Sequence, residues 1–204
     1  MIKLYRFRFS TNVERVTLAL AHKRLPVESV WVDPDDRGVV ERVSGQRLVP
    51  VIDDDGHVVF DSTAILHHLE ERYSEPPLFP RDQARRAHMD VYIDWFNRVC
   101  KRPPNDLEAE LLSERPDQGR IAELAAWMAR NLDFHERLLA SRDYLFGADF
   151  TAADCAAFPF LKYALAREPQ DAEPFHRILD DYQSVSERPR LAAWIESVDR
   201  RPRV

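Results

Sequence analysis

Two short stretches decide the fold of this chain: LVPVI at residues 48–52 and DSTAI at residues 61–65. In the first, Pro50 interrupts an apolar run that otherwise predicts a buried strand, where proline forfeits a hydrogen-bond donor of the ladder. A cis bond between Val49 and Pro50 would turn the backbone at the point where the strand begins. A cis bond at the start of the strand is thus one way to accommodate this proline.

The second stretch follows a short hairpin at residues 53–56 and a strand at residues 57–60, and it opens a helix on Asp61 and Ser62. Helix N-termini carry unpaired backbone N–H groups and a positive partial charge. Together with the exposed amides of a neighbouring turn, such a terminus captures carboxylates. The two stretches therefore predict a site for a small anion.

The composition is typical of a globular protein. The chain has 204 residues, which is long enough for two modest domains or a single large one. Hydrophobic residues make up 45% and charged residues 31%, which excludes a disordered or fibrous class. The net charge of −6 argues against a general nucleic-acid binder, because such proteins need a basic face to displace counterions.

Cysteine usage and the first residues bear on the compartment. Cys100 and Cys155 are the two cysteines and form no C-x-x-C motif, so we expect a reducing, cytoplasmic setting and no disulfide framework. The charges scattered through residues 1–9 do not fit a signal peptide. Because no apolar run approaches the length of a membrane span, we expect no membrane association.

The first third of the chain alternates between strand and helix patterns. Runs rich in β-branched residues predict strands, and apolar residues at helical spacing predict helices. The expected elements are a strand at 2–7, a helix through 13–24, a strand at 27–32, an irregular or short helical connection at 33–44, the proline strand with its hairpin, and a helix at 62–73. This order, β-α-β-α-β-β-α, predicts an α/β domain with a mixed sheet.

A proline-rich break, SEPPLFP at residues 74–80, follows this α/β part, and everything after it has helical spacing. A long helix with apolar positions from 89 to 96 should end before Pro103 and Pro104. The sequence FTAADC at residues 150–155 contains a T-x-x-D capping box, which marks a helix start. The expected division is a domain at 1–75, a linker at 76–83 and an all-helical domain at 84–204.

In this order and at these separations, the motifs resemble the glutathione transferase superfamily over essentially the whole chain. The resemblance rests on STNVERV at 10–16, LVPV at 48–51, DS at 61–62, FTAAD at 150–154 and the last-helix pattern from 189 to 202. Members join a thioredoxin-like domain to an all-helical domain. The motifs resemble cytosolic, serine-type members, with theta-, delta- and omega-like features. The resemblance implies glutathione as co-substrate, a small electrophile, a homodimer and no metal.

Members of this superfamily make the thiol of glutathione nucleophilic by lowering its pKa. A free thiol with a pKa near 8.5 is only ~3% thiolate at pH 7. Lowering that pKa by two units costs roughly 2.7 kcal/mol. A hydrogen bond to the charged sulfur contributes about 1.5–3 kcal/mol, and a helix N-terminus adds roughly 0.3–1 kcal/mol. One hydroxyl at the start of the first helix is therefore sufficient to lower the pKa of the thiol by about two units.

Ser10 is the candidate for this hydroxyl, because its place six residues before Val16 resembles the catalytic serine of theta- and delta-like members. The pair Glu14 and Arg15 also resembles omega-like sequences, which carry a cysteine at the position of Ser10. Because this chain lacks that cysteine, conjugation is favoured over thiol transfer. The alternative is structural: Thr11 and Glu14 form a capping box, with Thr11 as the cap and Ser10 just outside the helix. Asn12 is a weaker catalytic candidate.

The resemblance also implies contacts to the γ-glutamyl end of glutathione. Ser62 would hold its carboxylate through the hydroxyl and the backbone amide, while Asp61 would accept from its ammonium group. The family more often has Glu or Gln before this serine, and Asp is one methylene shorter. An ordinary N-cap pair is the alternative interpretation.

Further positions complete the predicted glutathione site. Val49, next to Pro50, would bind the cysteinyl unit through its backbone. Arg47, three residues before the proline, would face the glycyl carboxylate, although Gln46 competes for that role and a solvated surface arginine is the alternative. Asn12 in the first helix is also included among the glutathione contacts.

Two other groups of residues do not predict a site. His67 and His68 are adjacent on a predicted helix and so point in different directions, whereas a zinc site needs three or four convergent ligands. Tyr92, Trp95 and Phe96 form an aromatic stripe that could border the electrophile pocket, but such a stripe is more often core or dimer interface.

Two other functions stay open at this point. A non-catalytic member of the superfamily could act as a stress-linked binding or scaffold protein, because fold alone does not define function. A specialised glutathione-dependent isomerase or dehalogenase is a third hypothesis. The zeta-like isomerase pattern Ser-Ser-Cys is absent, since the chain has Ser10, Thr11 and Asn12 at those positions.

Overall fold

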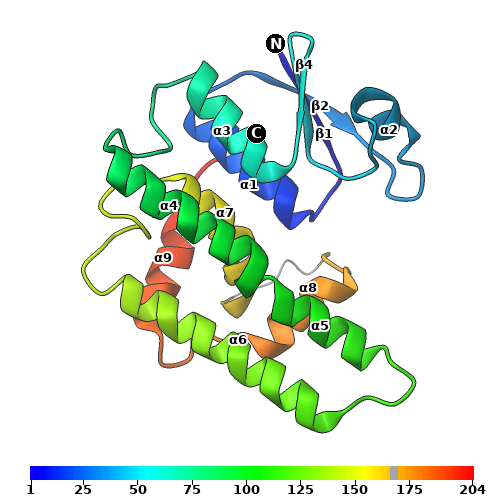
Figure 1. Ribbon diagram of the computed structural model, residues 1–204, viewed down its shortest axis with the longest axis vertical. Helices are drawn as coiled ribbons and strands as arrows, with labels where there is room; N and C mark the ends of the chain where they lie inside the picture. Colours follow the sequence, from blue (N-terminus) through cyan, green and yellow to red (C-terminus); the bar gives the residue numbers. More distant parts are fainter. Residues whose placement is uncertain (166–169) are drawn as a thin grey trace. The chain divides into compact units, whose positions relative to one another are not determined.

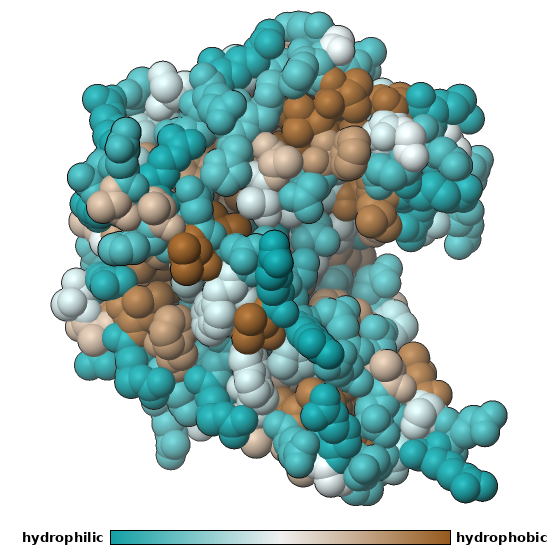
Figure 2. Space-filling model, in the orientation of Figure 1, coloured by the Kyte–Doolittle hydropathy of each residue, from teal (hydrophilic) through white to brown (hydrophobic). Residues whose placement is uncertain are grey.

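The computed structural model describes residues 1–165 and 170–204. The described chain divides into two compact units (Figure 1). The first contains residues 1–82 together with residues 201–204, and the second contains residues 83–200. On the face drawn in Figure 2, hydrophilic side chains predominate and hydrophobic ones occur in small groups among them. None of the described helices is long and apolar enough to span a membrane.

The first unit is the predicted α/β domain with a four-stranded mixed sheet. Its elements are β1 (Ile2–Arg6), α1 (Thr11–His22), β2 (Val27–Trp31), α2 (Gly38–Ser44), β3 (Val51–Asp54), β4 (His57–Phe60) and α3 (Ser62–Arg72). The strand order is β2-β1-β3-β4, in which β1 pairs with β2 in parallel and with β3 antiparallel. The sequence predicted either an irregular or a short helical connection at 33–44, and the structure has the helix α2 there.

The core of this unit joins the sheet to α1 and α2. Tyr5 and Val51, which are paired across β1 and β3, pack in one cluster with Val13 of α1, Val40 of α2 and Val49. β-branched valines suit this packing because their side chains are stiff and lose little freedom on burial. The same cluster therefore holds the start of α1 next to the residue before Pro50.

A buried ion pair anchors the proline-rich segment after α3. Lys23 Nζ lies 2.8 Å from Glu70 Oε2 and also donates to the carbonyl oxygens of Tyr73 and Pro76. Glu70 in turn accepts from the backbone N–H of Leu78. Buried charges are tolerated when they are paired and hydrogen-bonded in this way. The predicted linker is thus tied to α1 and α3 over at least its first half.

The last four residues belong to the α/β unit, although they follow the last helix in sequence. Arg201 donates to His22 Nδ1 at 3.0 Å, and Arg203 forms an ion pair with Glu14 at 3.0 Å. Arg6 donates to the carbonyl oxygen of residue 204 at 2.7 Å. These contacts attach the end of the chain to both ends of α1.

The second unit is helical. Its elements are α4 (Gln83–Trp95), the π-helix η1 (Phe96–Cys100), α5 (Arg102–Leu111), α6 (Gln118–Leu138), α7 (Ala152–Leu161), the 3-10 helix η2 (Lys162–Ala164), α8 (Pro174–Tyr182) and α9 (Pro189–Asp199). As expected, the helical run of α4 and η1 ends before Pro103 and Pro104, and the two prolines lie in the first turn of the next helix, α5. Proline is tolerated there, since the N–H groups of a first turn have no intrahelical partner.

The capping box predicted at residues 150–155 is present and organises the core of the helical unit. Thr151 is the N-cap of α7, and the fully buried Asp154 accepts from its backbone N–H at 2.8 Å. Asp154 Oδ1 also accepts from the N–H of Leu145 and from Trp194 Nε1, both at 2.9 Å. Burial raises the pKa of Asp154, and these hydrogen bonds oppose that shift. One carboxylate therefore connects α7, α9 and the loop before α7.

The aromatic stripe of α4 and the start of η1 is mainly core. Tyr92 and Phe96 are buried, and Trp95 packs its ring against Phe134. The Tyr92 hydroxyl lies 2.8 Å from Nε2 of His135, whose Nδ1 lies 2.8 Å from the carbonyl oxygen of Asn131. Burial of His135 lowers its pKa to about 4, with the hydrogen bond to Asn131 opposing the shift. His135 is thus a neutral residue of the helical core at pH 7.

This burial predicts a specific loss of stability in acid. Below the ordinary pKa of 6.5 the unfolded state binds a proton at His135, whereas the folded state does not until about pH 4. The free energy of unfolding should therefore fall as the pH drops through this window, by as much as about 3 kcal/mol from this residue. Urea unfolding at pH 7 and pH 4 should show a smaller acid loss for His135→Gln than for wild type. Equal losses would contradict this assignment.

Candidate functional site

The pairing register brings the three predicted site segments to one end of the sheet. Tyr5 of β1 pairs with Val51 of β3, and Val51 pairs with Phe60 of β4. The next positions outward are the end of β1, Pro50 before β3, and Asp61 after β4. We call the residues at this end, Phe9, Ser10, Val49, Pro50, Asp61 and Ser62, the site edge.

Ser10 is the N-cap of α1, at the first corner of the site edge. Its Oγ accepts a hydrogen bond from the N–H of Val13 at 3.3 Å. The alternative in which Thr11 is the cap is wrong, because α1 already begins at Thr11. Among the described residues no acceptor takes the Ser10 hydroxyl proton. A hydroxyl can accept and donate at once, so Ser10 can cap α1 and still donate to a ligand.

Phe9 precedes Ser10 with an unusual backbone conformation. Its φ is 60°, in the left-handed region that residues other than glycine rarely occupy. Such strain concentrates at functional sites, where the surrounding structure holds it in place. The conformation of Phe9 therefore marks the turn between β1 and α1 as a candidate site in its own right.

The Val49–Pro50 bond is cis, as predicted from the sequence. The side chain of Val49 is buried in the core cluster described above. Within the described parts of the chain, neither the N–H nor the C=O of Val49 has a hydrogen-bond partner. Both backbone groups are therefore open to an extended ligand at the site edge.

Asp61 combines the N-cap of α3 with a second strained conformation. Its φ is 70° and its ψ 124°, and its Oδ1 accepts from the N–H groups of Thr63 and Ala64 at 2.8 and 3.1 Å. In the described structure its Oδ2 has no partner. One oxygen of this exposed carboxylate thus serves the helix, and the other is left for a cation.

Ser62 begins α3 and is buried. It contacts Arg15, which the sequence analysis did not identify as a site residue. Arg15, which is 1% exposed, donates from Nη1 to Ser62 Oγ at 3.4 Å. A guanidinium can only donate, so Ser62 Oγ is the acceptor and its own proton is directed elsewhere. Arg15 lies among the apolar positions of α1, and no local pattern distinguishes it from an exposed arginine.

Arg47, Gln46 and Asn12 are less closely tied to the site edge. Arg47 forms an exposed ion pair with Glu41 at 3.1 Å. Gln46 accepts from the N–H of Leu48 at 2.6 Å and donates to its carbonyl oxygen at 3.0 Å, so its side chain stabilises the loop before β3. Asn12 is half-buried in the first turn of α1. Arg47 and Gln46 compete for the predicted contact to the glycyl carboxylate. Arg47 is the better placed of the two, because its exposed ion pair with Glu41 can be replaced by a ligand.

The adjacent histidines have structural partners. His68 Nε2 lies 2.8 Å from the buried Asp54, and the ring of His67 stacks on Phe79. No cluster of three or more His, Cys, Asp or Glu side chains suited to a metal ion occurs in the described residues.

Together these observations define a two-unit protein, with a thioredoxin-like α/β unit that carries the site edge and an all-helical unit. The family model for the glutathione S-transferase N-terminal domain matches residues 4–77, and the model for the glutathione S-transferase C-terminal domain matches residues 118–197. The chain belongs to the glutathione transferase superfamily.

Individual relatives agree with this assignment. Glutathione S-transferase 3 of Zea mays is 30% identical over 98% of this chain and 90% of its own length. FtsZ-localized protein A of Caulobacter vibrioides is 30% identical over 76% of this chain and 73% of its own length. Among solved structures, a glutathione S-transferase from Rhodospirillum rubrum F11 is 26% identical, with a TM-score of 0.77 over 99% of this chain and 89% of that one.

The strained cap at Asp61 predicts an unusual order of stability among variants. Asp61→Ala loses the cap, worth about 1 kcal/mol, and keeps the β-carbon whose left-handed conformation already costs about 1–2 kcal/mol in wild type. Asp61→Gly loses the cap but relieves the strain, so it should be the more stable of the two in urea unfolding.

Asp117 supplies the matched control, because it caps α6 through Gly119 and Arg120 with an ordinary φ of −83°. The free energies of unfolding of the glycine and alanine variants at position 117 should differ by only about 1 kcal/mol, because glycine is the better N-cap residue of the two. If the glycine advantage at position 61 is no larger than at position 117, strain does not distinguish Asp61.

Proposed function

We propose that this chain is a glutathione transferase in which Ser10 activates the thiol of glutathione for attack on a small electrophile. The observation that supports it most is the convergence at the site edge. There a hydroxyl with a free proton, an unpaired extended backbone and a helix N-terminus lie at one end of one sheet.

The γ-glutamyl end of glutathione would bind at the start of α3. Its carboxylate would accept from the N–H and the hydroxyl of Ser62, where the helix terminus and the buried Arg15 both favour negative charge. Its ammonium group would donate to the open Oδ2 of Asp61. Asp is shorter than the Glu or Gln usual in the family, but both cap hydrogen bonds go to Oδ1, which leaves Oδ2 for this contact.

The rest of the tripeptide would follow the backbone before β3. The N–H and C=O of Val49, held at the turn by Pro50, would pair with the cysteinyl unit. Arg47 would then bind the glycyl carboxylate in place of Glu41. This exchange is inexpensive, because an exposed ion pair contributes only about 0–1 kcal/mol. Asn12, in the first turn of α1, would complete the contacts.

Thiol activation would come from Ser10 and the helix it caps. The Ser10 hydroxyl would donate to the cysteinyl sulfur and stabilise the thiolate over the thiol. The hydrogen bond that Ser10 Oγ accepts from Val13 polarises the hydroxyl and makes it a better donor. The thiol proton leaves to solvent, and the sulfur uses its electron pair to form a bond to the electrophilic carbon. A leaving group then departs with its own bonding pair.

The cysteines of this chain do not favour thiol–disulfide chemistry. Neither cysteine lies near the site edge in sequence, and both are buried. Burial raises the pKa of Cys100, so this thiol is a poor nucleophile. Conjugation is therefore the reaction class that the residues favour.

A second candidate function is a scaffold role without catalysis. It is motivated by the similarity to FtsZ-localized protein A, a relative whose name describes a location and not a reaction. A scaffold would need neither the free hydroxyl proton of Ser10 nor the open backbone of Val49. Substitution of Ser10 separates the two functions.

Ser10→Ala should lower kcat for conjugation of glutathione with chlorodinitrobenzene by about tenfold to a hundredfold, the loss of one hydrogen bond to a charged sulfur. The KM for glutathione should change little, because the other contacts remain. Steady-state kinetics at pH 7 measures both quantities.

Two controls accompany this experiment. Ser10→Thr keeps a hydroxyl and should retain most of the turnover, and Asp117→Ala removes a helix cap from the other unit without affecting kcat. If Ser10→Ala turns over like wild type, Ser10 is only a cap. If wild type binds glutathione without turnover, the scaffold function is favoured.

A further inference from the structure

Glu14 carries a carboxylate in the first turn of α1, one turn after Ser10. Its backbone N–H donates to the carbonyl oxygen of Ser10 at 3.0 Å. Because α1 begins at Thr11, Glu14 is the fourth helical residue, one position too far along to form a capping box with Ser10. A carboxylate in a first turn still stabilises the helix, because it faces the positive end of the helix dipole.

The same carboxylate lies close to the hydroxyl that is proposed to bind the sulfur of glutathione. Residues four positions apart on a helix have β-carbons only about 5–6 Å apart. The helix N-terminus carries roughly half an elementary positive charge, and a full negative charge beside it cancels that field. A nearby negative charge also raises the pKa of a thiol, because it disfavours the thiolate. By itself, Glu14 would therefore oppose thiol activation at Ser10.

Arg203 supplies the opposite charge. Its Nε and Nη2 both donate to Glu14 Oε1, at 3.3 and 3.0 Å, and its Nη1 donates to the carbonyl oxygen of Arg201 at 2.8 Å. All three nitrogens of the guanidinium thus have acceptors, which holds the planar fork in one orientation. The side chains of Arg203 and Glu14 are only 24% and 15% exposed.

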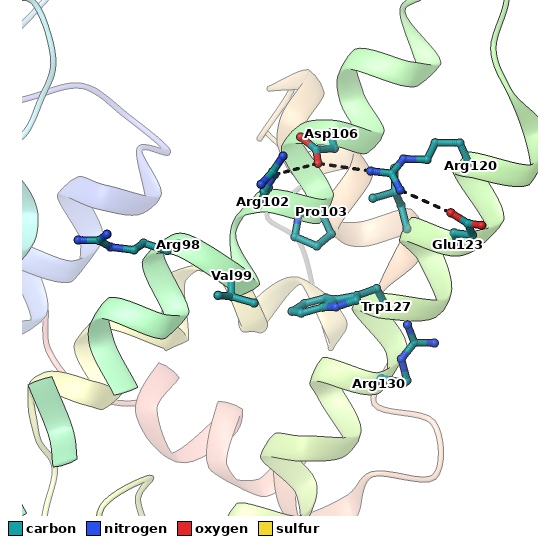
Figure 3. A pocket seen from close by; sticks show the side chains of 10 residues that line it. Arg98, Val99, Arg102, Pro103, Asp106, Arg120, Glu123, Trp127 and Arg130 are labelled. Carbon is teal, nitrogen blue, oxygen red and sulfur yellow. Dashed lines mark hydrogen bonds and ion pairs between the residues drawn. The ribbon is translucent and has the colours of Figure 1, made fainter. Parts of the chain in front are cut away.

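This low exposure distinguishes the pair from ion pairs of the helical unit. Figure 3 shows a network beside the cavity between α5 and α6, in which Arg102 and Arg120 approach Asp106 at 3.3 and 3.8 Å. The two arginine side chains there are 76% and 48% exposed, so water and salt screen their charges. Glu14 and Arg203 are screened less, so their pairing has a larger effect on the field at the start of α1.

Two other arginines attach residues 201–204 to the α/β unit. Arg201 donates to Nδ1 of His22, the last residue of α1, and Arg6 donates to the carbonyl oxygen of residue 204. These two contacts do not involve Arg203. A variant at position 203 therefore keeps two anchors of the segment, which separates the charge of Arg203 from the attachment of the segment as a whole.

We propose that Arg203 is a positioning residue for thiol activation, which pairs with Glu14 and so keeps the start of α1 positive at Ser10. This inference rests on the proposed function, because it concerns the same thiol. In this role Arg203 acts through Glu14 and the helix terminus, and not by contact with glutathione. Glu14 can then stabilise α1 without opposing the thiolate.

The test is a pH titration of the thiolate absorbance of bound glutathione in four proteins: wild type, Arg203→Gln, Glu14→Gln and the double variant. Arg203→Gln removes the positive charge beside Glu14 and should raise the pKa of the bound thiol by about half a unit, the effect of one partly screened charge. Glu14→Gln should lower this pKa, and the double variant should return it to the wild-type value. These opposite directions do not arise from a general loss of structure.

Turnover gives a second readout. For conjugation with chlorodinitrobenzene, kcat of Arg203→Gln should fall about threefold at pH 6, in proportion to the smaller thiolate fraction. At pH 9 the bound thiol is ionised in both proteins, so kcat of Arg203→Gln should equal that of wild type. A purely structural role for Arg203 would lower kcat at both pH values.

Arg201→Gln is the matched control, because it removes an arginine contact of the same segment at the other end of α1. Its bound thiol should have the wild-type pKa, and Arg203→Lys, which keeps the charge, should stay close to it. If wild type lowers the thiol pKa but Arg203→Gln has the same value, or if Arg201→Gln raises it equally, this inference alone is overturned. If wild type does not lower the thiol pKa, the proposed function fails and the inference fails with it.

Discussion

The antiparallel pairing of β3 with both β1 and β4 is the constraint on which the candidate site depends. Because Tyr5, Val51 and Phe60 are aligned across three strands, the residues just beyond them must meet at one end of the sheet. A slip of one residue would turn every side chain of a strand to the opposite face. The buried cluster of Tyr5, Val51 and the valines around them prevents that slip. Core packing thus determines the position of the site.

In the proposed function, Ser10 and Asp61 use different atoms for their structural and their chemical roles. Ser10 Oγ accepts from the first turn of α1 while its proton stays available, and Asp61 uses one oxygen to cap α3. These duties fix the side chains before any ligand arrives, so less ordering entropy is lost on binding. The left-handed conformations of Phe9 and Asp61 add local strain that the surrounding fold must offset.

Local patterns in the sequence predicted the fold and much of the candidate site, whereas long-range pairs escaped them. The cis proline and the box at Thr151 depend on neighbouring residues, and both were confirmed. The contact of Arg15 with Ser62 joins residues 47 positions apart, and the Lys23–Glu70 pair does the same. Their sequence neighbours do not distinguish them from surface charges. The alternative with Thr11 as the cap was wrong, and the sequence alone could not exclude it because serine and threonine both cap helices well.

The central claim is that the site edge binds glutathione and makes its thiol acidic. The most direct test is a titration of the ultraviolet thiolate absorbance of glutathione against pH, with and without saturating protein. We expect the pKa of the bound thiol to lie one to two units below the value of about 8.5 for a free thiol. Glutathione that binds with an unchanged thiol pKa, or that does not bind at all, would contradict the account.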